Sequence, residues 1–319
     1  MSVSNDGTPS SRLLPGQVIV VADATVRRNG GMEGLSLAIE QGEWLSVFGP
    51  AASGKTTVLR ILAGEVRPES GQTVATPGLR RFLVGDERPG PGRLSARNKL
   101  LWRLGRLGVS PLRRSARAQE ALEVMDLLRA QDVPETALSG GQRIALEIAA
   151  ALACEPDVLL LDNVTAALAP RVTARLFAFL DDRRAADGLA VVHATTASHE
   201  AERADRVLML DRGRALACGA IEDMMRRYAP DRVTVEAADP SAVRRTLRGI
   251  YDVEITETRD GLRFAAADPV DTAANLFRHP PDGMRAVYVA RGDLWQVYAA
   301  LKADRDTSGP GNPAPPASA

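Results

Sequence analysis

Features that would place this chain in a specialised class are missing from its sequence. No run of 18 uncharged apolar residues occurs, so the sequence predicts no membrane-spanning helix. The only cysteines, Cys154 and Cys218, lie far apart and form neither a disulfide framework nor a C-x-x-C motif. Basic and acidic residues balance at 40 each, so no net charge favours nucleic acid as a partner. The first 16 residues lack the apolar core of a signal peptide, and we therefore expect a cytoplasmic protein.

What is present is an ordinary globular composition in a chain long enough for two domains. The 319 residues are 45% hydrophobic and 25% charged. The sequence changes character around Pro230, and its two ends are rich in small polar residues, glycine and proline. We expect disordered ends at residues 1–16 and 304–319, a first domain at 17–229 with a helical subdomain at roughly 94–137, and a second domain at 230–303.

Strand-like and helix-like segments alternate through the first domain. Apolar runs at residues 44–48, 81–84, 158–162, 189–192 and 207–210 are typical of buried parallel strands, and helical patterns separate most of them. This alternation predicts a mostly parallel sheet with helices on its faces. After residue 230 the order becomes βαββαβ, which is that of a ferredoxin-like α+β domain, and a last helix follows at residues 293–302.

The strongest motif follows the strand at residues 44–48. It matches G-x-x-x-x-G-K-[ST] between a strand and a helix, the context in which this motif binds phosphate. Its glycines let backbone N–H groups approach an anion at the start of a helix, the lysine reaches the outer phosphates, and Thr56 offers its hydroxyl to Mg²⁺. The predicted nucleotide-binding residues are Gly49, Pro50, Ala51, Ala52, Ser53, Gly54, Lys55, Thr56 and Thr57.

Two further stretches narrow the chemistry. Asp162 ends the strand at residues 158–162, where such sites place a carboxylate that holds Mg²⁺. Ser139 can cap a helix whose first residues are glycines, which expose backbone N–H groups and make a second candidate anion site. The residues of this second site are Ser139, Gly140, Gly141 and Gln142.

In this order, the three motifs resemble those of ATP-binding-cassette (ABC) ATPases over roughly residues 17–228. The resemblance implies ATP and Mg²⁺ as ligands and a P-loop fold with a mixed sheet and a helical subdomain. It also implies that two such subunits enclose two ATP molecules, each site taking its phosphate loop from one subunit and its signature, here Ser139–Gly140–Gly141–Gln142, from the other. The expected partners are a membrane permease and a second ATPase subunit, which would place the chain on the inner face of the membrane.

The second domain is similar to the C-terminal extension of ATPases that serve drug and antibiotic exporters. This similarity depends on the layout of the domain and on its last helix, which contains Leu294, Trp295 and Tyr298. It implies export, with a regulatory or dimer-stabilising role for the appended domain.

Several positions depart from the family pattern. Asn163 stands where the family has a water-activating glutamate, and Thr196 stands where it has a histidine. Asparagine can orient water but cannot accept its proton. Asp86 takes the place of a glutamine near the phosphates, where a carboxylate can act as a metal ligand, and Ala169 replaces an aspartate. The segment from residue 22 to 28 offers no aromatic ring to stack on adenine.

These departures leave alternatives open. His193 and His199 lie near Thr196, but we interpret both as surface or packing residues. We expect an exporter ATPase whose own site binds MgATP and hydrolyses it weakly or not at all, in a dimer with a different subunit. A working ATPase with its base elsewhere and a regulatory or scaffold protein that closes on ATP are the alternatives. Translation and DNA-repair members of the superfamily fit less well, since they carry two cassettes or long coiled coils.

Overall fold

The computed structural model describes residues 12–27, 31–85, 93–250, 253–258, 261–266 and 268–308. The chain divides after Cys218 into two compact units, and the second begins at Gly219 and includes the described residues up to 308. Each unit has its own sheet and its own buried apolar core.

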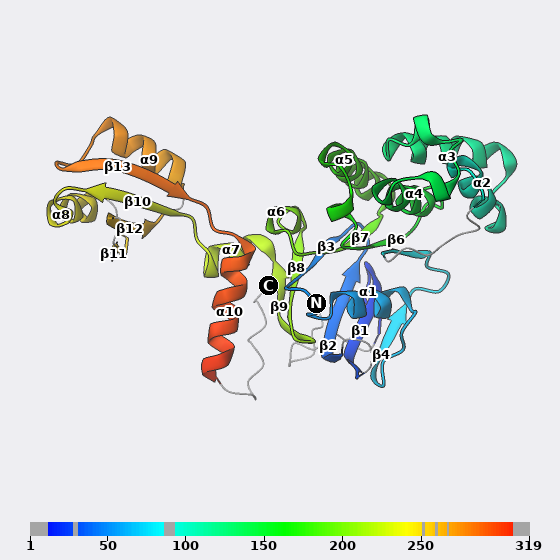
Figure 1. Cartoon of the computed structure of the whole chain (residues 1–319). Helices are drawn as coiled ribbons and strands as arrows, with labels where there is room; N and C mark the ends of the chain where they lie inside the picture. Colours follow the sequence, from blue (N-terminus) through cyan, green and yellow to red (C-terminus); the bar gives the residue numbers. More distant parts are fainter. Residues whose placement is uncertain are drawn as a thin grey trace. The chain divides into compact units, whose positions relative to one another are not determined.

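A six-stranded sheet forms the centre of the first unit. Its neighbouring strands β5 (Arg81–Val84), β6 (Val158–Asp162), β7 (Ala190–Thr195), β3 (Trp44–Phe48) and β8 (Arg206–Asp211) pair in parallel, as the alternation of strands and helices predicts. The apolar side chains of β3 and β6 are fully buried, which explains why these strands carry no alternating polar residues. In spatial order the strands are β5, β6, β7, β3, β8 and β9 (Arg214–Ala220) (Figure 1).

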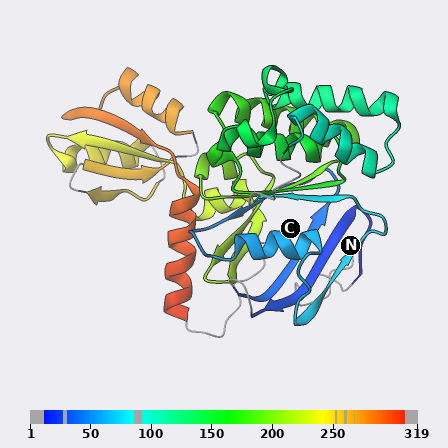
Figure 2. The same ribbon diagram turned by 45° about the vertical axis from the view of Figure 1, so that its right-hand side comes forward.

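A smaller antiparallel sheet faces the first one across a helix. Its strands lie in the order β2 (Met32–Glu40), β1 (Gln17–Val26) and β4 (Ser70–Ala75). The helix α1 (Lys55–Ala63) packs between the two sheets, and one continuous core joins β1, β2, α1 and the strands β3, β6, β7 and β8 (Figures 1 and 2). This packing holds the start of α1, and with it the phosphate loop, against the strand ends.

The opposite face of the parallel sheet is covered by α5 (Pro170–Asp187) (Figure 1). Trp44 of β3 meets the edge of Phe177 of α5 at 5.2 Å between ring centroids, an arrangement favoured by the charge distribution of aromatic rings. A short helix, α6 (Ser198–Ala201), follows β7, and the 3₁₀ turn η3 (Thr165–Ala167) follows β6.

A helical region continues the first unit between β5 and β6. It comprises α2 (Ala96–Arg106), α3 (Pro111–Val124), the 3₁₀ turns η1 (Leu128–Ala130) and η2 (Glu135–Ala137), and α4 (Gly140–Leu152). The buried ammonium of Lys99 pairs with Glu135 at 2.5 Å and also with Glu147. Because an unpaired buried charge is costly, these pairs tie α2 to η2 and α4.

The second unit has the ferredoxin-like topology expected from the sequence. Its antiparallel sheet runs in the order β11–β12–β10–β13, so the first and third of its strands in the chain lie in the centre. Val233, Val235 and Phe264 are among the buried side chains of its core. The elements are α7 (Ile221–Tyr228), β10 (Arg232–Ala237), α8 (Pro240–Ile250), β11 (Thr256–Thr258), β12 (Gly261–Ala265), α9 (Pro269–Arg278), β13 (Met284–Ala290) and α10 (Leu294–Ser308).

Some local predictions differ from the structure. The second strand of the expected βαββαβ order is predicted at residues 252–255, but residues 253–255 form no strand and β11 starts at Thr256. The last helix, predicted to end at Lys302, continues to Ser308, and therefore takes in residues assigned to a disordered tail. The helix α7 packs on α10, so both helices belong to the second unit, which begins at Gly219.

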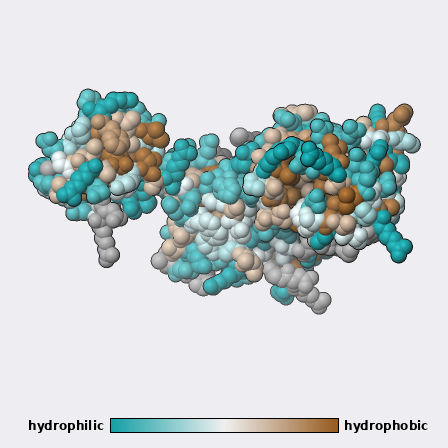
Figure 3. Space-filling model, turned by 45° about the horizontal axis from the view of Figure 1, so that its top comes forward, coloured by the Kyte–Doolittle hydropathy of each residue, from teal (hydrophilic) through white to brown (hydrophobic). Residues whose placement is uncertain are grey.

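The surface of both units is mixed in hydropathy, with local apolar patches (Figure 3). In the helical region Trp102, Leu107 and Leu112 are exposed, and in the second unit Phe277 and Tyr288 are. Within the described part of the chain, no helix has both the length and the apolar character needed to cross a membrane.

Candidate functional site

Three of the predicted site segments begin at the same edge of the parallel sheet. The strands β3 and β6 flank β7, and the pairing places Phe48 beside Thr195 and Asp162 beside Ala194. Since the strands are parallel, the residues that follow them emerge together. The phosphate loop after Phe48, Asn163 after Asp162, and Thr196 after Thr195 therefore lie along one edge.

The phosphate loop closes tightly at Gly49. A Cβ atom on this residue would lie 2.3 Å from the carbonyl oxygen of Leu210 in β8, so only glycine fits without a backbone shift. The loop then passes through Ala52, which has a positive φ of 59°, and reaches the N-cap of α1 at Gly54. The loop is thus a fixed turn that delivers the chain into a helix N-terminus.

Lys55 lies inside this turn rather than on the surface. Its ammonium donates hydrogen bonds to the carbonyl oxygens of Gly49 at 2.8 Å and Pro50 at 2.7 Å. Burial lowers the pKa of Lys55, and the negative charge of Asp162 opposes this shift. The lysine is therefore held over the loop with the carboxylate of β6 within electrostatic range.

The polar groups of the loop fit an anionic ligand. The hydroxyl of Ser53 is buried and has no hydrogen-bond partner among the described residues. No side chain caps α1, and its first turn contains no acidic residue, so its N–H groups and positive dipole end are not neutralised locally. A phosphate would satisfy both features.

Of the predicted metal ligands, Thr56 and Asp162 lie in the described part of the chain. Asp162 is half-buried at the end of β6, and Thr56 is half-buried in the first turn of α1. In the described residues no three His, Cys, Asp or Glu side chains gather around a common point. This donor set suits Mg²⁺, which commonly takes few protein ligands and completes its shell with phosphate oxygens and water. Asp86 lies outside the described residues, although its neighbour Gly85 adjoins Asp162.

Asn163 and Thr196 are both exposed at this edge. Asn163 has a left-handed backbone with φ of 53°, a conformation that asparagine tolerates better than most residues, and its N–H donates to the carbonyl of Ala194 at 2.9 Å. Neither side chain can supply a general base at neutral pH.

The two nearby histidines differ in environment. His199 is exposed on α6, whereas His193 is fully buried in β7 against the edge of Phe177. Burial lowers the pKa of His193 to about 4 in spite of the nearby carboxylate of Glu200, so it is neutral at pH 7. His193 therefore packs inside the unit.

The signature residues form the N-terminus of α4. The Ser139 hydroxyl accepts from the N–H of Gln142 at 3.3 Å, and the Gln142 side chain accepts from the N–H of Ser139 at 2.9 Å. This reciprocal capping fixes the helix start while Ser139 and Gly140 stay exposed. The surface they form is open to a second molecule.

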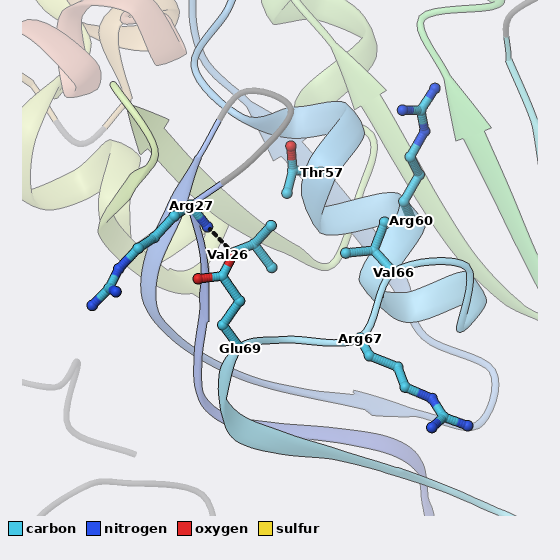
Figure 4. Close-up of a pocket in the computed structure, with 7 residues that line it drawn as sticks. All are labelled: Val26, Arg27, Thr57, Arg60, Val66, Arg67 and Glu69. Atoms are coloured by element: carbon cyan, nitrogen blue, oxygen red, sulfur yellow. Dashed lines mark hydrogen bonds between the residues drawn. The ribbon is translucent and has the colours of Figure 1, made fainter.

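A cavity of about 570 Å³ adjoins the loop along α1 (Figure 4). Thr57 and Val26 line it, and the side chain of Glu69 accepts a hydrogen bond from the N–H of Arg27 at 3.2 Å. The remaining lining residues are Arg60, Val66 and Arg67. Among the described residues that line the cavity there are three arginines and no aromatic residue.

A cluster of polar side chains near this edge corresponds to no motif in the sequence. Thr165, His193, Thr195 and Glu200 contact one another there. Their spacing follows no motif, and the only available signal was polar residues interrupting an otherwise apolar strand.

Comparisons with known proteins also indicate a nucleotide-binding protein. A family model described as ABC transporter matches residues 32–166. Over 207 residues the chain is 37% identical to the cobalt import ATP-binding protein CbiO of Rhodobacter capsulatus, covering 59% of this chain and 72% of that protein. Over 234 residues it is 32% identical to the daunorubicin resistance ATP-binding protein DrrA3 of Streptomyces coeruleorubidus, covering 68% and 72%.

Among solved structures, the fold is similar to that of a dimeric bacterial ABC transporter cassette. The TM-score is 0.57 at 25% identity, and the match covers 64% of this chain and 98% of that one.

Proposed function

The chain belongs to the ABC transporter family as an ATP-binding subunit, and on this premise we propose that it powers export through a separate membrane permease. The similarity to the daunorubicin resistance protein supports export, as does the extra ferredoxin-like unit after the cassette. Import is the second candidate, since the cobalt import protein is also similar. Export predicts that deleting the chain raises sensitivity to a toxic compound, whereas import predicts reduced uptake of a nutrient.

ATP is proposed to bind with its phosphates on residues 49–57. Lys55 would leave its carbonyl partners to pair with the outer phosphates, and the unpartnered Ser53 hydroxyl would gain an acceptor. Thr56 and Asp162 would hold Mg²⁺, which screens the negative charge that develops on phosphate oxygens. Asp86 is a further proposed ligand. The cavity beside Thr57 and Val26 is where the nucleoside would lie.

Hydrolysis at this chain's own loop is proposed to be weak or absent. Asn163 offers an amide where a carboxylate would take the proton of water, and a positioned base typically accelerates such steps by about 10²–10⁴. Thr196 can donate a hydrogen bond to a phosphate but carries no charge. Binding of ATP and closure of the dimer would remain possible without cleavage.

A heterodimer is the proposed assembly. The intact, exposed signature at residues 139–142 would complete the site of a second, catalytically competent ATPase subunit. The exposed apolar side chains Trp102, Leu107 and Leu112 supply a surface suited to protein contact. The assembly would lie at the inner face of the cell membrane, and the unit after residue 230 would regulate or stabilise the dimer.

Two substitutions test this asymmetry in the complex purified with its permease and second ATPase subunit. Ser139→Arg should abolish ATPase activity, because a large cation would block the signature that serves the competent site. Lys55→Ala should spare a measurable fraction, because it disables only the weak site. Ser95→Arg is the matched control, since Ser95 also caps a helix of the same region but lies outside the signature.

Two results would contradict the asymmetric arrangement. One is complete loss of activity from Lys55→Ala alone. The other is turnover by the isolated chain at a rate ordinary for an ATPase, about 1–10³ s⁻¹.

A further inference from the structure

The carboxylate of Glu200 lies between two buried hydroxyl groups. It accepts hydrogen bonds from Oγ1 of Thr165 and Oγ1 of Thr195, each at 2.8 Å. Thr165 is 5% exposed and Thr195 is 1% exposed. Hydrogen bonds to a charged group in a poorly solvated place are among the stronger ones in proteins. Glu200 therefore joins two segments that are far apart in the sequence.

Both segments carry residues of the proposed nucleotide site. Thr195 is the last residue of β7 and directly precedes Thr196. Its hydroxyl oxygen also accepts from the N–H of Ala197 at 3.0 Å, so the turn around Thr196 is bracketed by one side chain. Thr165 opens the turn η3, two residues after Asn163. Glu200 thus links the turns behind Asn163 and Thr196 from inside the unit.

The histidine beneath this link reinforces it. Nε2 of His193 lies 3.5 Å from Oγ1 of Thr165 and 3.8 Å from Glu200, while Nδ1 has no partner. Because the Thr165 proton points to Glu200, its oxygen is available to Nε2–H. Burial keeps His193 uncharged, since its pKa is about 4, so no second charge competes for the carboxylate.

The far end of η3 touches the signature. A Cβ atom on Gly141 would lie 2.6 Å from the carbonyl oxygen of Ala167, the last residue of η3. The start of α4 therefore rests directly on the turn that Thr165 anchors. One continuous path of contacts runs from Thr195 through Glu200 and Thr165 to Ala167 and Gly141.

We propose, building on the function proposed above, that Glu200 is a positioning residue that couples the segment containing Thr196 to the signature at Gly141 through the turn η3. A change in the position of Thr196 on nucleotide binding would move the Glu200 carboxylate and with it η3. The signature that serves the second subunit would then report the state of this chain's own site. Coupling of this kind needs a linked element with few alternative positions, which the buried hydroxyl–carboxylate contacts provide.

Amide hydrogen exchange on the full chain tests the link without relying on activity. The N–H of Leu168 bonds to Thr165, and the N–H of Arg143 bonds to Ser139, so their exchange reports on η3 and on the start of α4. Glu200→Ala should raise exchange at both amides by about tenfold. Glu202→Ala is the matched control, because the Glu202 carboxylate accepts from Ser198 within the same short stretch and should alter neither amide.

Rescue distinguishes positioning from general loosening. Glu200→Gln keeps a carbonyl oxygen that can accept a hydrogen bond from one threonine. On a logarithmic scale of exchange rate, it should restore at least half of the protection that Glu200→Ala removes at the two amides. Faster exchange at Leu168 with no change at Arg143 would overturn the link to the signature. Equal loosening across β3 and β7 in Glu200→Ala would overturn it too, because that result indicates only a destabilised fold.

A second measurement separates this inference from the proposed function. In the purified complex, Glu200→Ala should lower kcat by about tenfold and change KM for MgATP less than twofold, because the phosphate loop is untouched. If MgATP fails to bind the wild-type chain, the proposed function is wrong while the exchange result still stands. If MgATP binds and both kcat and exchange at Arg143 stay unchanged in Glu200→Ala, the coupling is wrong.

Discussion

The phosphate loop and the segments after β6 and β7 share one sheet edge but are built in opposite ways. The loop depends on backbone geometry, with Gly49 against a carbonyl of β8 and Lys55 folded onto the loop. The segments after β6 and β7 depend on side chains, with Glu200 holding Thr165 and Thr195 from below. The first arrangement admits few substitutions, and the second leaves its outermost residues free to vary.

This difference explains how the site can depart from the family pattern without losing its fold. Asn163 and Thr196 are exposed and support no core contact, so replacing their side chains costs little stability. The buried groups beneath them remain paired. If the proposed function holds, binding and cleavage of ATP can therefore separate, because the loop proposed to bind the phosphates depends on backbone geometry while Asn163 and Thr196 lie on the surface.

The strongest test of this separation restores a base. Asn163→Glu should raise the ATPase rate of this chain's own site by about 10² or more, measured in the complex after the competent site of the second subunit has been inactivated through its phosphate-loop lysine. The left-handed φ of 53° at this position costs a non-glycine residue about 1 kcal/mol, which glutamate can bear in a stable domain. Asn163→Gln, with similar length but no carboxylate, is the control and should leave the rate unchanged. An increase below tenfold would mean that water activation does not limit hydrolysis here.

The buried His193, which lies beneath the segments after β6 and β7, predicts that the stability of the fold depends on pH. The pKa of His193 is about 4 in the folded protein and 6.5 when unfolded, so the unfolded state binds the proton more tightly. The contribution of the neutral His193 to the free energy of unfolding is fully present above pH 6.5. It is lost as the pH falls toward 4, by about 3 kcal/mol in all. Urea unfolding at pH 7 and pH 4.5 should show a smaller loss for His193→Leu than for the wild type.

His199→Leu is the control for this measurement, because His199 is exposed on α6. It should lose as much stability on acidification as the wild type does. Parallel losses in the wild type and His193→Leu would show that the buried imidazole does not titrate in this range.

The phosphate loop, which depends on backbone geometry, predicts a smaller and local loss of stability on substitution. Gly49→Ala should lower the free energy of unfolding by about 2 kcal/mol, because the new Cβ would force β8 and the loop apart. It should also abolish MgATP binding measured by calorimetry. Gly78→Ala is the matched control: it too has a positive φ, 77°, but nothing lies within 4 Å of the added atom. It should cost about 1 kcal/mol and leave binding intact.

The sequence predicts much of the first unit because its strands are buried and its loop is a motif. The limits of β3, β5 and β6 match the predicted runs, since each is bounded by turn residues or by the end of an apolar run. The sequence predicts no strand at β4, because Ser70 and Gly71 are typical turn residues, and in the structure pairing with β1 overrides that local preference.

The link through Glu200 could not be predicted from the sequence. Thr165 and Glu200 are 35 residues apart, and only the pairing of β6 with β7 brings them together. A hydroxyl and a carboxylate form no spacing pattern, so long-range contacts of this kind depend on the fold. The same holds for the approach of Gly141 to Ala167, which gives a reason for glycine that no local motif states.

The position of Lys55 has a consequence for how nucleotide comes and goes. Its ammonium already holds two carbonyl oxygens, so an arriving phosphate competes with bonds inside the protein and not only with water. When the phosphate leaves, the Lys55 ammonium can bond to those carbonyl oxygens again, so its buried charge stays paired. Such an exchange of partners lowers affinity and favours reversible binding, which fits the proposed closure and reopening of the dimer.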